Sequence, residues 1–382
     1  PGRVALAPWS EAPPAPQPEF PGLPAVRGGP IPALLVCDLN GDGVNELILY
    51  DEPRVRVLRL LANKLERMSE YTSSSIPVFA DLNGGGTVEI VLSAISPETA
   101  PAVVALTPVL GDKLLWKTVF PEPERFGLPH ARTAYMRTIH LRGKSTPDLY
   151  LWAGLPVVRS ARLSGLTGEI LWEKGEVPNS ERYWGPSANF ASAYDFNGDG
   201  KEDLVFTNPD YYCVADGATG DFLLGPLFPP TIFNQPSQGL YTLPAILEQK
   251  DKIPTVCLAA GHYFQAAMSL RAEPYWYHMP KVGEHRSGVE AFLQLKDGSW
   301  LMGFGRENGH FACVNVADGS TRWELSLEAS ASDVVSCDID GDSRVEFLFT
   351  TSHGKLYAVG DDDGVPRVVW SVELGAAGGA PI

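Results

Sequence analysis

The sequence has few features of a nucleic-acid-binding or membrane-spanning protein. Of its 382 residues, 30 are Lys or Arg and 46 are Asp or Glu, so the formal net charge is −16, and no basic run forms a patch for a phosphate backbone. Apolar runs such as 34–37 and 90–92 are far shorter than the roughly 18 residues that a membrane helix needs. We therefore expect no nucleic-acid partner and no membrane span, although an anchor upstream of Pro1 is compatible with the sequence.

Cysteine and catalytic motifs are also scarce. The five cysteines form no CxxC pair, which excludes a dense disulfide framework and leaves a cysteine zinc site without support. We expect Cys37 and Cys337 to be buried free thiols. GxSxG, HExxH and Walker-type motifs are absent. The most reactive-looking segment, 275–285, places His278 and His285 around Glu284, and we interpret it as a loop that packs aromatic residues. The sequence thus predicts a protein that is not an enzyme.

Long helices are not indicated either. The chain shows no sustained helical period, and its 38 glycines and 33 prolines favour turns between short strands. Residues 1–32 contain ten prolines, which exclude a regular helix or a central strand. We predict that this stretch is a Pro-rich leader or linker and that 33–382 forms the folded domain.

A repeated pattern runs through the rest of the chain: an apolar run, an acidic Gly-rich loop and a second apolar run. Clear copies occupy 34–49, 78–92, 193–206 and 335–349. Degenerate copies begin near residues 140, 247 and 294. The spacing between copies is roughly 43 to 59 residues, which is typical of propeller blades. The sequence therefore contains seven units.

A second signature follows the loop in most units: a Gly-containing turn and then a strand with tryptophan. Examples end at Trp116, Trp172, Trp323 and Trp370, and we expect these side chains to pack between neighbouring units. One unit then consists of a strand, the acidic loop, a second strand, a hairpin, a third strand, a turn and a fourth strand. Four strands per unit predict an all-β fold, a β-propeller of about seven four-stranded blades.

The acidic loops carry the ligand pattern of a calcium site. Side-chain oxygens at positions 1, 3, 5 and 9, with a main-chain carbonyl at position 7, are the hard ligands that Ca²⁺ prefers. An EF-hand is excluded because its position 12 is a strand hydrophobe here and no helices flank the loop. The three strong sets are Asp38, Asn40, Asp42, Val44 and Glu46; Asp195, Asn197, Asp199, Lys201 and Asp203; and Asp338, Asp340, Asp342, Arg344 and Glu346.

Two further loops depart from this pattern. The loop at 81 keeps Asp81, Asn83 and Glu89 but has Gly85 at position 5, which predicts a weaker or water-completed site. The loop at 140 has basic residues at ligand positions and should bind no cation. We therefore expect about three strong Ca²⁺ sites and one weak site.

These loops resemble the FG-GAP/VCBS repeats of integrin-α-type β-propellers, which carry an Asp-x-Asn/Asp-Gly-Asp-Gly-x-x-Asp/Glu calcium motif. The resemblance covers about 33–382, and the Gly-x-x-x-Trp turns are additionally similar to the tryptophan-docking blades of quinoprotein-like propellers. The resemblance implies a secreted, cell-surface or periplasmic protein that acts in adhesion, ligand binding or as a scaffold.

We therefore predict a calcium-binding, non-catalytic propeller that binds a protein or glycan on one face. The alternative is a carbohydrate-active enzyme of the polysaccharide-lyase type, or a lectin, because related lyases use calcium-loop propellers. Aromatic residues at 183–184, 211–212 and 275–277 are candidates for contacts with a sugar or protein, unless they pack in the core.

Overall fold

The computed structural model describes residues 33–51, 53–61, 64–96, 99–108, 112–120, 133–141, 146–154, 159–175, 190–207, 212–227, 244–248, 253–260, 264–278 and 289–374. These residues form seven four-stranded antiparallel sheets, each built from four consecutive strands. The strands are β1 (Ala33–Cys37), β2 (Glu46–Asp51), β3 (Arg54–Leu61), β4 (Lys64–Thr72), β5 (Val78–Ala80), β6 (Glu89–Ser96), β7 (Thr99–Thr107), β8 (Lys113–Val119), β9 (Thr133–Ile139), β10 (Asp148–Gly154), β11 (Arg159–Leu163), β12 (Ile170–Gly175), β13 (Phe190–Tyr194), β14 (Asp203–Thr207), β15 (Tyr212–Ala215), β16 (Phe222–Leu227), β17 (Ala245–Leu247), β18 (Thr255–Ala260), β19 (Phe264–Ser269), β20 (Pro274–His278), β21 (Ala291–Gln294), β22 (Trp300–Gly305), β23 (His310–Asn315), β24 (Thr321–Ser326), β25 (Ala331–Cys337), β26 (Glu346–Thr351), β27 (Lys355–Asp362) and β28 (Val365–Glu373).

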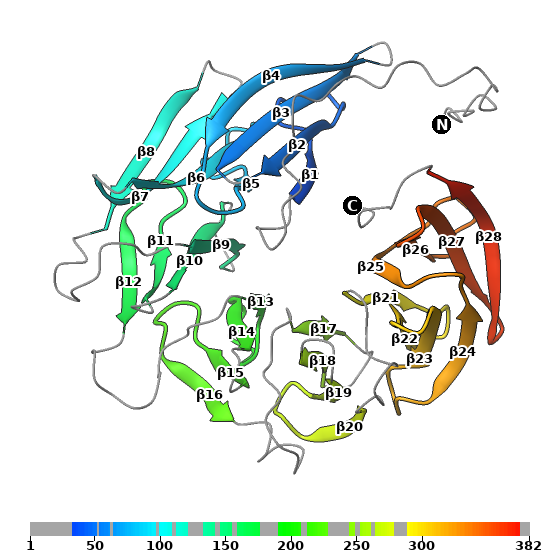
Figure 1. Ribbon diagram of the computed structural model, residues 1–382. Helices are drawn as coiled ribbons and strands as arrows, with labels where there is room; N and C mark the ends of the chain where they lie inside the picture. The colour runs from blue at the N-terminus through cyan, green and yellow to red at the C-terminus, as the bar shows by residue number, and fades with distance from the viewer. Residues whose placement is uncertain are drawn as a thin grey trace.

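The sheets stand around a ring, and we number them blades 1 to 7 in chain order. Figure 1 shows the first strand of each blade nearest the centre and the fourth strand at the rim. The prediction of a seven-bladed all-β propeller is confirmed. The predicted leader, 1–32, lies outside the described residues and stays a prediction. The described residues contain no helix long and apolar enough to cross a membrane.

Each acidic or degenerate loop joins the first strand of its blade to the second. The loop of blade 1 connects β1 to β2, and the degenerate copies near 140, 247 and 294 occupy the same connection in blades 3, 5 and 6. The glycines of the motif permit the tight turn, because Gly41 and Gly43 have φ of 72° and 82°. In blade 7 Ser343 takes the place of the second glycine and still has a φ of 66°.

Hydrophobic side chains fill the spaces between blades. Six clusters of buried residues each join two consecutive blades, from the pair of blades 1 and 2 to the pair of blades 6 and 7. In the part of the chain that the structure describes, no such cluster joins blade 7 to blade 1. Strand β2 of blade 1 alternates buried and half-buried residues, whereas β26 of blade 7 is buried throughout.

Three of the predicted tryptophans, Trp116, Trp172 and Trp323, donate hydrogen bonds to the next blade, and the packing of Trp370 stays a prediction. The indole Nε1 of Trp116 in blade 2 donates to the Gly165 carbonyl of blade 3 at 2.7 Å. Trp172 in blade 3 donates to the Gly217 carbonyl of blade 4 at 3.1 Å. A Cβ on Gly220 would lie 2.9 Å from the Trp172 ring, so the glycine permits this close approach.

The prediction that Cys37 and Cys337 are buried is wrong. Both are free thiols, but Cys37 is only half-buried and Cys337 is exposed. Each residue is the last of the first strand of its blade, next to the acidic loop, and Figure 1 shows that these strands lie nearest the centre of the ring. The partial loss of solvent contact at the Cys337 thiol still raises its pKa, and the Glu346 and Asp338 carboxylates add to this effect.

Candidate metal centre

The acidic loops of blades 1, 4 and 7 share one hydrogen-bond pattern. In blade 1 the Asp38 carboxylate accepts hydrogen bonds from the amides of Gly41 and Gly43, both at 2.8 Å. Asp195 in blade 4 accepts from Gly198 and Gly200, and Asp338 in blade 7 accepts from Gly341 and Ser343, at 2.7 to 2.9 Å. The repeated sequence therefore folds into the same turn three times.

The last acid of each loop is buried at the start of the second strand. Glu46, Glu89 and Glu346 are 0% exposed and Asp203 is 1% exposed. Each accepts a hydrogen bond from the amide next to the first acid; for Glu46 the donor is Leu39, at 2.9 Å. A buried carboxylate is costly unless it is paired with a cation or with hydrogen-bond donors. The remaining oxygen of each of these acids therefore needs a partner.

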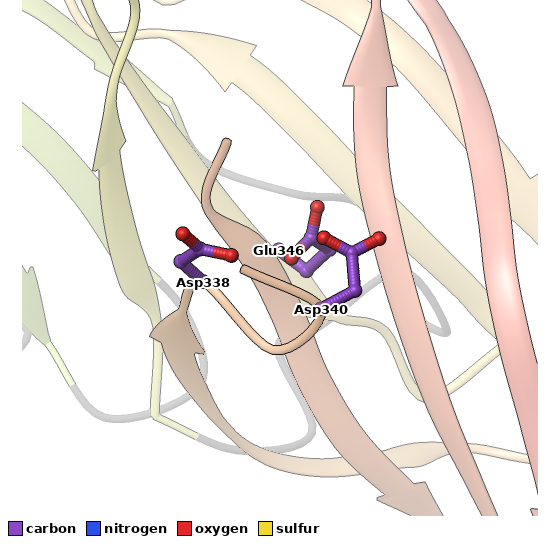
Figure 2. A group of neighbouring side chains, drawn as sticks. All are labelled: Asp338, Asp340 and Glu346. Carbon is purple, nitrogen blue, oxygen red and sulfur yellow. The ribbon is translucent and has the colours of Figure 1, made fainter. Parts of the chain in front are cut away.

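Blade 7 brings three carboxylates close together. One oxygen each of Asp338, Asp340 and Glu346 lies within 4.8 Å of the others. Figure 2 shows the three groups turned toward one another, two from the loop and one from β26. Burial raises the pKa of Glu346, and repulsion from Asp340 and Asp342 raises it further. A divalent cation placed among these oxygens would remove that repulsion.

Blade 1 holds a buried oxygen without a hydrogen bond. Within the described residues, Glu46 Oε1 has no hydrogen-bond donor. The nearest charged group is Arg59 of β3, whose Nε lies 3.7 Å away and also lacks a hydrogen bond. The other end of this guanidinium pairs with Asp42, which lowers the pKa of that carboxyl. A fully buried carboxylate oxygen that accepts no hydrogen bond from the described residues fits a calcium ligand set.

Blade 4 satisfies its last acid with backbone amides. Asp203 accepts hydrogen bonds from Phe196 at 3.0 Å and from Gly217 at 3.1 Å. Burial nevertheless raises the pKa of Asp203, and the charge of nearby Asp216 adds to the shift. The loop also contacts blade 3 through a bridge between Lys201 and Leu141.

In the two loops that depart from the calcium pattern, the last acid is paired with other side chains of the same blade. In blade 2 the Asn83 amide donates to Glu89 Oε1 at 2.7 Å, and the Thr107 hydroxyl donates to the same oxygen at 3.2 Å. In blade 3 the guanidinium of Arg162 binds Asp148, the acid at the equivalent position, with Nε at 2.9 Å. The basic residues that the sequence placed in this loop, at 142 and 144, lie outside the described residues.

Sequence reasoning missed Arg59, Arg162 and Arg367, the guanidinium partners of these acids. In blade 7, Arg367 Nη2 lies 3.2 Å from Glu346 Oε1. The sequence signal for them was a basic residue on the third or fourth strand of a unit. Whether such a residue reaches the acid of the loop depends on how the strands pair, which the sequence does not give. Of the predicted ligands, Asp338, Asp340 and Glu346 of blade 7 come together, whereas among the described residues the acids of blades 1 and 4 form no such close group. Whether any of the loops binds Ca²⁺ stays a prediction.

The other candidate residues are spread over the fold. Tyr212 is 0% exposed and belongs to the core, whereas Tyr275 and Tyr277 of β20 are 48% and 44% exposed. The remaining predicted aromatic candidates, at 183–184 and 211, lie outside the described residues, and so do Glu284 and His285. The histidine segment therefore has no described geometry that would indicate catalysis.

A polar groove lies beside the blade 7 loop. Its volume is about 560 Å³, and blades 6 and 7 line it with charges of both signs, including Asp297, Arg322, Arg344 and Asp362. Arg322 and Asp361 form a two-pronged pair at its wall, at 2.7 and 2.8 Å. The groove thus offers hydrogen-bond donors and acceptors next to a candidate cation site.

The comparisons with known proteins agree with this architecture. A model of the FG-GAP repeat matches residues 188–222, which include the acidic loop of blade 4. The chain is similar to Sqt1 of Saccharomyces cerevisiae (TM-score 0.61, 11% identity, 88% of this chain and 84% of Sqt1). It is also similar to the rhamnogalacturonan lyase YesW (TM-score 0.52, 14% identity, 88% of this chain and 70% of YesW). None of the curated protein sequences matches it. The chain is therefore a seven-bladed β-propeller that carries an FG-GAP repeat in its fourth blade.

Proposed function

We propose that the protein is a calcium-binding, non-catalytic propeller that presents a rigid face to a protein or glycan partner. The observation that carries the proposal is the set of repeated loops in blades 1, 4 and 7. In blade 7 the carboxylates of Asp338, Asp340 and Glu346 lie close together, and in blade 1 the buried Glu46 Oε1 accepts no hydrogen bond from the described residues. Oxygen-only donor sets of this kind suit Ca²⁺ rather than a thiophilic metal.

Calcium would act on stability rather than on chemistry. Each loop joins the innermost strand of a blade to the next, so a bound ion ties these two strands together at one end of the sheet. Sites of this type in extracellular modules bind with dissociation constants of about 10⁻⁴ to 10⁻³ M. At ten times such a constant, each occupied site adds about 1.4 kcal/mol to the free energy of unfolding.

The proposed setting is extracellular, at a cell surface or in a periplasm, where calcium at this concentration is available. A protein or glycan would dock on the loop face, and the groove between blades 6 and 7 supplies charged groups of both signs for such a contact. The FG-GAP match supports this role because the repeat is typical of binding propellers, as the sequence resemblance implies.

The experiment is a thermal melt in 5 mM CaCl₂ and in excess EDTA, combined with a calcium stoichiometry. We expect EDTA to lower the melting temperature and the untreated protein to bind about three ions. Asp199→Asn should remove one ion, whereas the matched change Asp221→Asn, at an exposed partner of Lys174 outside the predicted ligand set, should remove none. Identical melts in both buffers would contradict calcium binding. Release of products from acidic polysaccharides in calcium buffer would instead support the lyase alternative.

A further inference from the structure

One position of each blade lies directly beside the buried last acid of the loop. The first residue after the acid pairs with a residue of the third strand. The position in question is the next residue along that third strand. In blade 1, Leu47 pairs with Leu58, so this position is Arg59. In blade 4, Leu204 pairs with Ala215, so it is Asp216. We call it the flanking position.

Its chemistry differs from blade to blade. Arg59 in blade 1 places a guanidinium against Asp42 and, at 3.7 Å, near Glu46. In blade 2 the position holds Thr107, whose hydroxyl binds Glu89. Blade 4 places a further carboxylate there, Asp216. The same strand position therefore carries a cation, a hydroxyl or an anion beside the last acid of the loop, depending on the blade.

Blade 7 also places a guanidinium beside its acids, but from the fourth strand rather than the third. Its flanking position is Gly360, which pairs with Arg367 of β28. Because Gly360 has no side chain, Arg367 crosses it and lies 3.2 Å from Glu346 and 3.6 Å from Asp342. Blades 1 and 7 thus each direct a guanidinium at positions 5 and 9 of their loops.

We propose that Arg59 and Arg367 are built-in competitors of calcium, so that the blade 4 loop binds the ion first and the loops of blades 1 and 7 bind it more weakly. The inference rests on the proposed function. The guanidinium contacts the same two carboxylates that would ligate the ion, and a cation close to those oxygens repels Ca²⁺. In blade 4 the charge at the flanking position has the opposite sign and attracts the ion.

The contacts in blade 1 show that the arginine is an imperfect substitute. Glu46 Oε1 and Arg59 Nε face each other at 3.7 Å, and neither forms a hydrogen bond within the described residues. In blade 3, by contrast, Arg162 binds Asp148 at 2.9 Å, so that pair is complete. In blade 1 a calcium ion can therefore compete with Arg59 for the acids of the loop. In blade 3 the guanidinium of Arg162 already neutralises Asp148.

The test is calorimetric titration of the full chain with CaCl₂. In the Asp199→Asn/Asp342→Asn background, which leaves blade 1 as the one strong predicted site beside the weak loop of blade 2, Arg59→Gln should lower the dissociation constant of the tighter step roughly tenfold. Arg59→Lys keeps the charge and should leave it within about threefold. The control is Arg306→Gln, which removes the same charge from a pair with Glu324 in blade 6 and should change nothing. The parallel pair, Arg367→Gln in Asp42→Asn/Asp199→Asn, tests blade 7 and covers any failure of the first variant to fold.

The order of binding gives a second readout. With the native arginines, the tightest calcium step should disappear in Asp199→Asn and persist in Asp42→Asn and in Asp342→Asn. Equal or weaker binding by both Arg→Gln variants, in chains whose acidic loops still bind calcium, overturns the inference and leaves the proposed function standing. Loss of the tightest step in Asp342→Asn alone also overturns it. Absence of calcium binding in every chain overturns both proposals.

Discussion

The ion pair of Arg162 and Asp148 in blade 3 allows a sharp test of how the degenerate loops are stabilised. Both side chains are almost completely buried, at 7% and 3% exposure. Arg162 donates to Asp148 with Nε at 2.9 Å and also contacts it through Nη2. Its Nη1 donates to the carbonyls of Gly217 and Ala218 in blade 4, at 3.3 and 3.2 Å. The arginine therefore neutralises the acid and links two blades.

Replacing Arg162 with Met should destabilise the protein by about 3–5 kcal/mol, because a buried carboxylate would lose the guanidinium that binds it. Loss of the two contacts to blade 4 places the expected value at the upper end of this range. The Arg162→Met/Asp148→Leu double variant should recover part of the loss, since no buried charge is left unpaired. Calcium should not rescue the single variant, because this loop lacks the other carboxylates.

The assay is urea unfolding followed by fluorescence, with the free energy extrapolated to water. Arg56→Met serves as the control, because Arg56 lies 3.7 Å from Glu70 on an open part of β3 and should cost less than about 1 kcal/mol. A loss below 1 kcal/mol for Arg162→Met, similar to the control, would refute the view that this arginine replaces a metal ion.

Three further outcomes follow from the packing and the charges. Gly220→Ala should destabilise by about 2–4 kcal/mol in urea unfolding, because the new Cβ would approach Trp172 to 2.9 Å at a φ of 73°, and no loss would contradict this packing. Ser343→Gly should stabilise by about 0.5–1 kcal/mol in thermal melts, since the φ of 66° strains a residue with a side chain; a lower melting temperature would argue against such strain. Burial acts to raise the pKa of Asp361, but hydrogen bonds from Arg322 and Trp323 outweigh it and hold that pKa below its usual range. The stabilisation is therefore present above the unfolded pKa of about 3.9 and is lost as the pH falls through the lower folded value, so the stability gap to Asp361→Asn should be large at pH 7 and shrink toward pH 2.5. An equal gap at both pH values would be the contrary result.

The number of blades and the position of every loop could be predicted from the sequence because each blade forms from consecutive strands. Antiparallel neighbours joined by short turns leave their signature within one unit of the chain, in the Asp/Asn/Gly loop and the Trp-containing strand. Even the degenerate copies near 140, 247 and 294 fall between the first and second strands, as the spacing predicts. Turn geometry at Gly41 and Gly43 is equally local.

The partners of the buried acids were decided by tertiary structure alone. Arg59 and Arg367 come from the third and fourth strands, and a bulge between Ala358 and Val359 helps to set which residues of β27 and β28 face each other. A shift of one residue turns a side chain to the other face of the sheet, so sequence spacing cannot say whether an arginine meets a carboxylate. The sequence by itself therefore determined the repeating frame, and the packing of the strands decided which charge lies beside each acid.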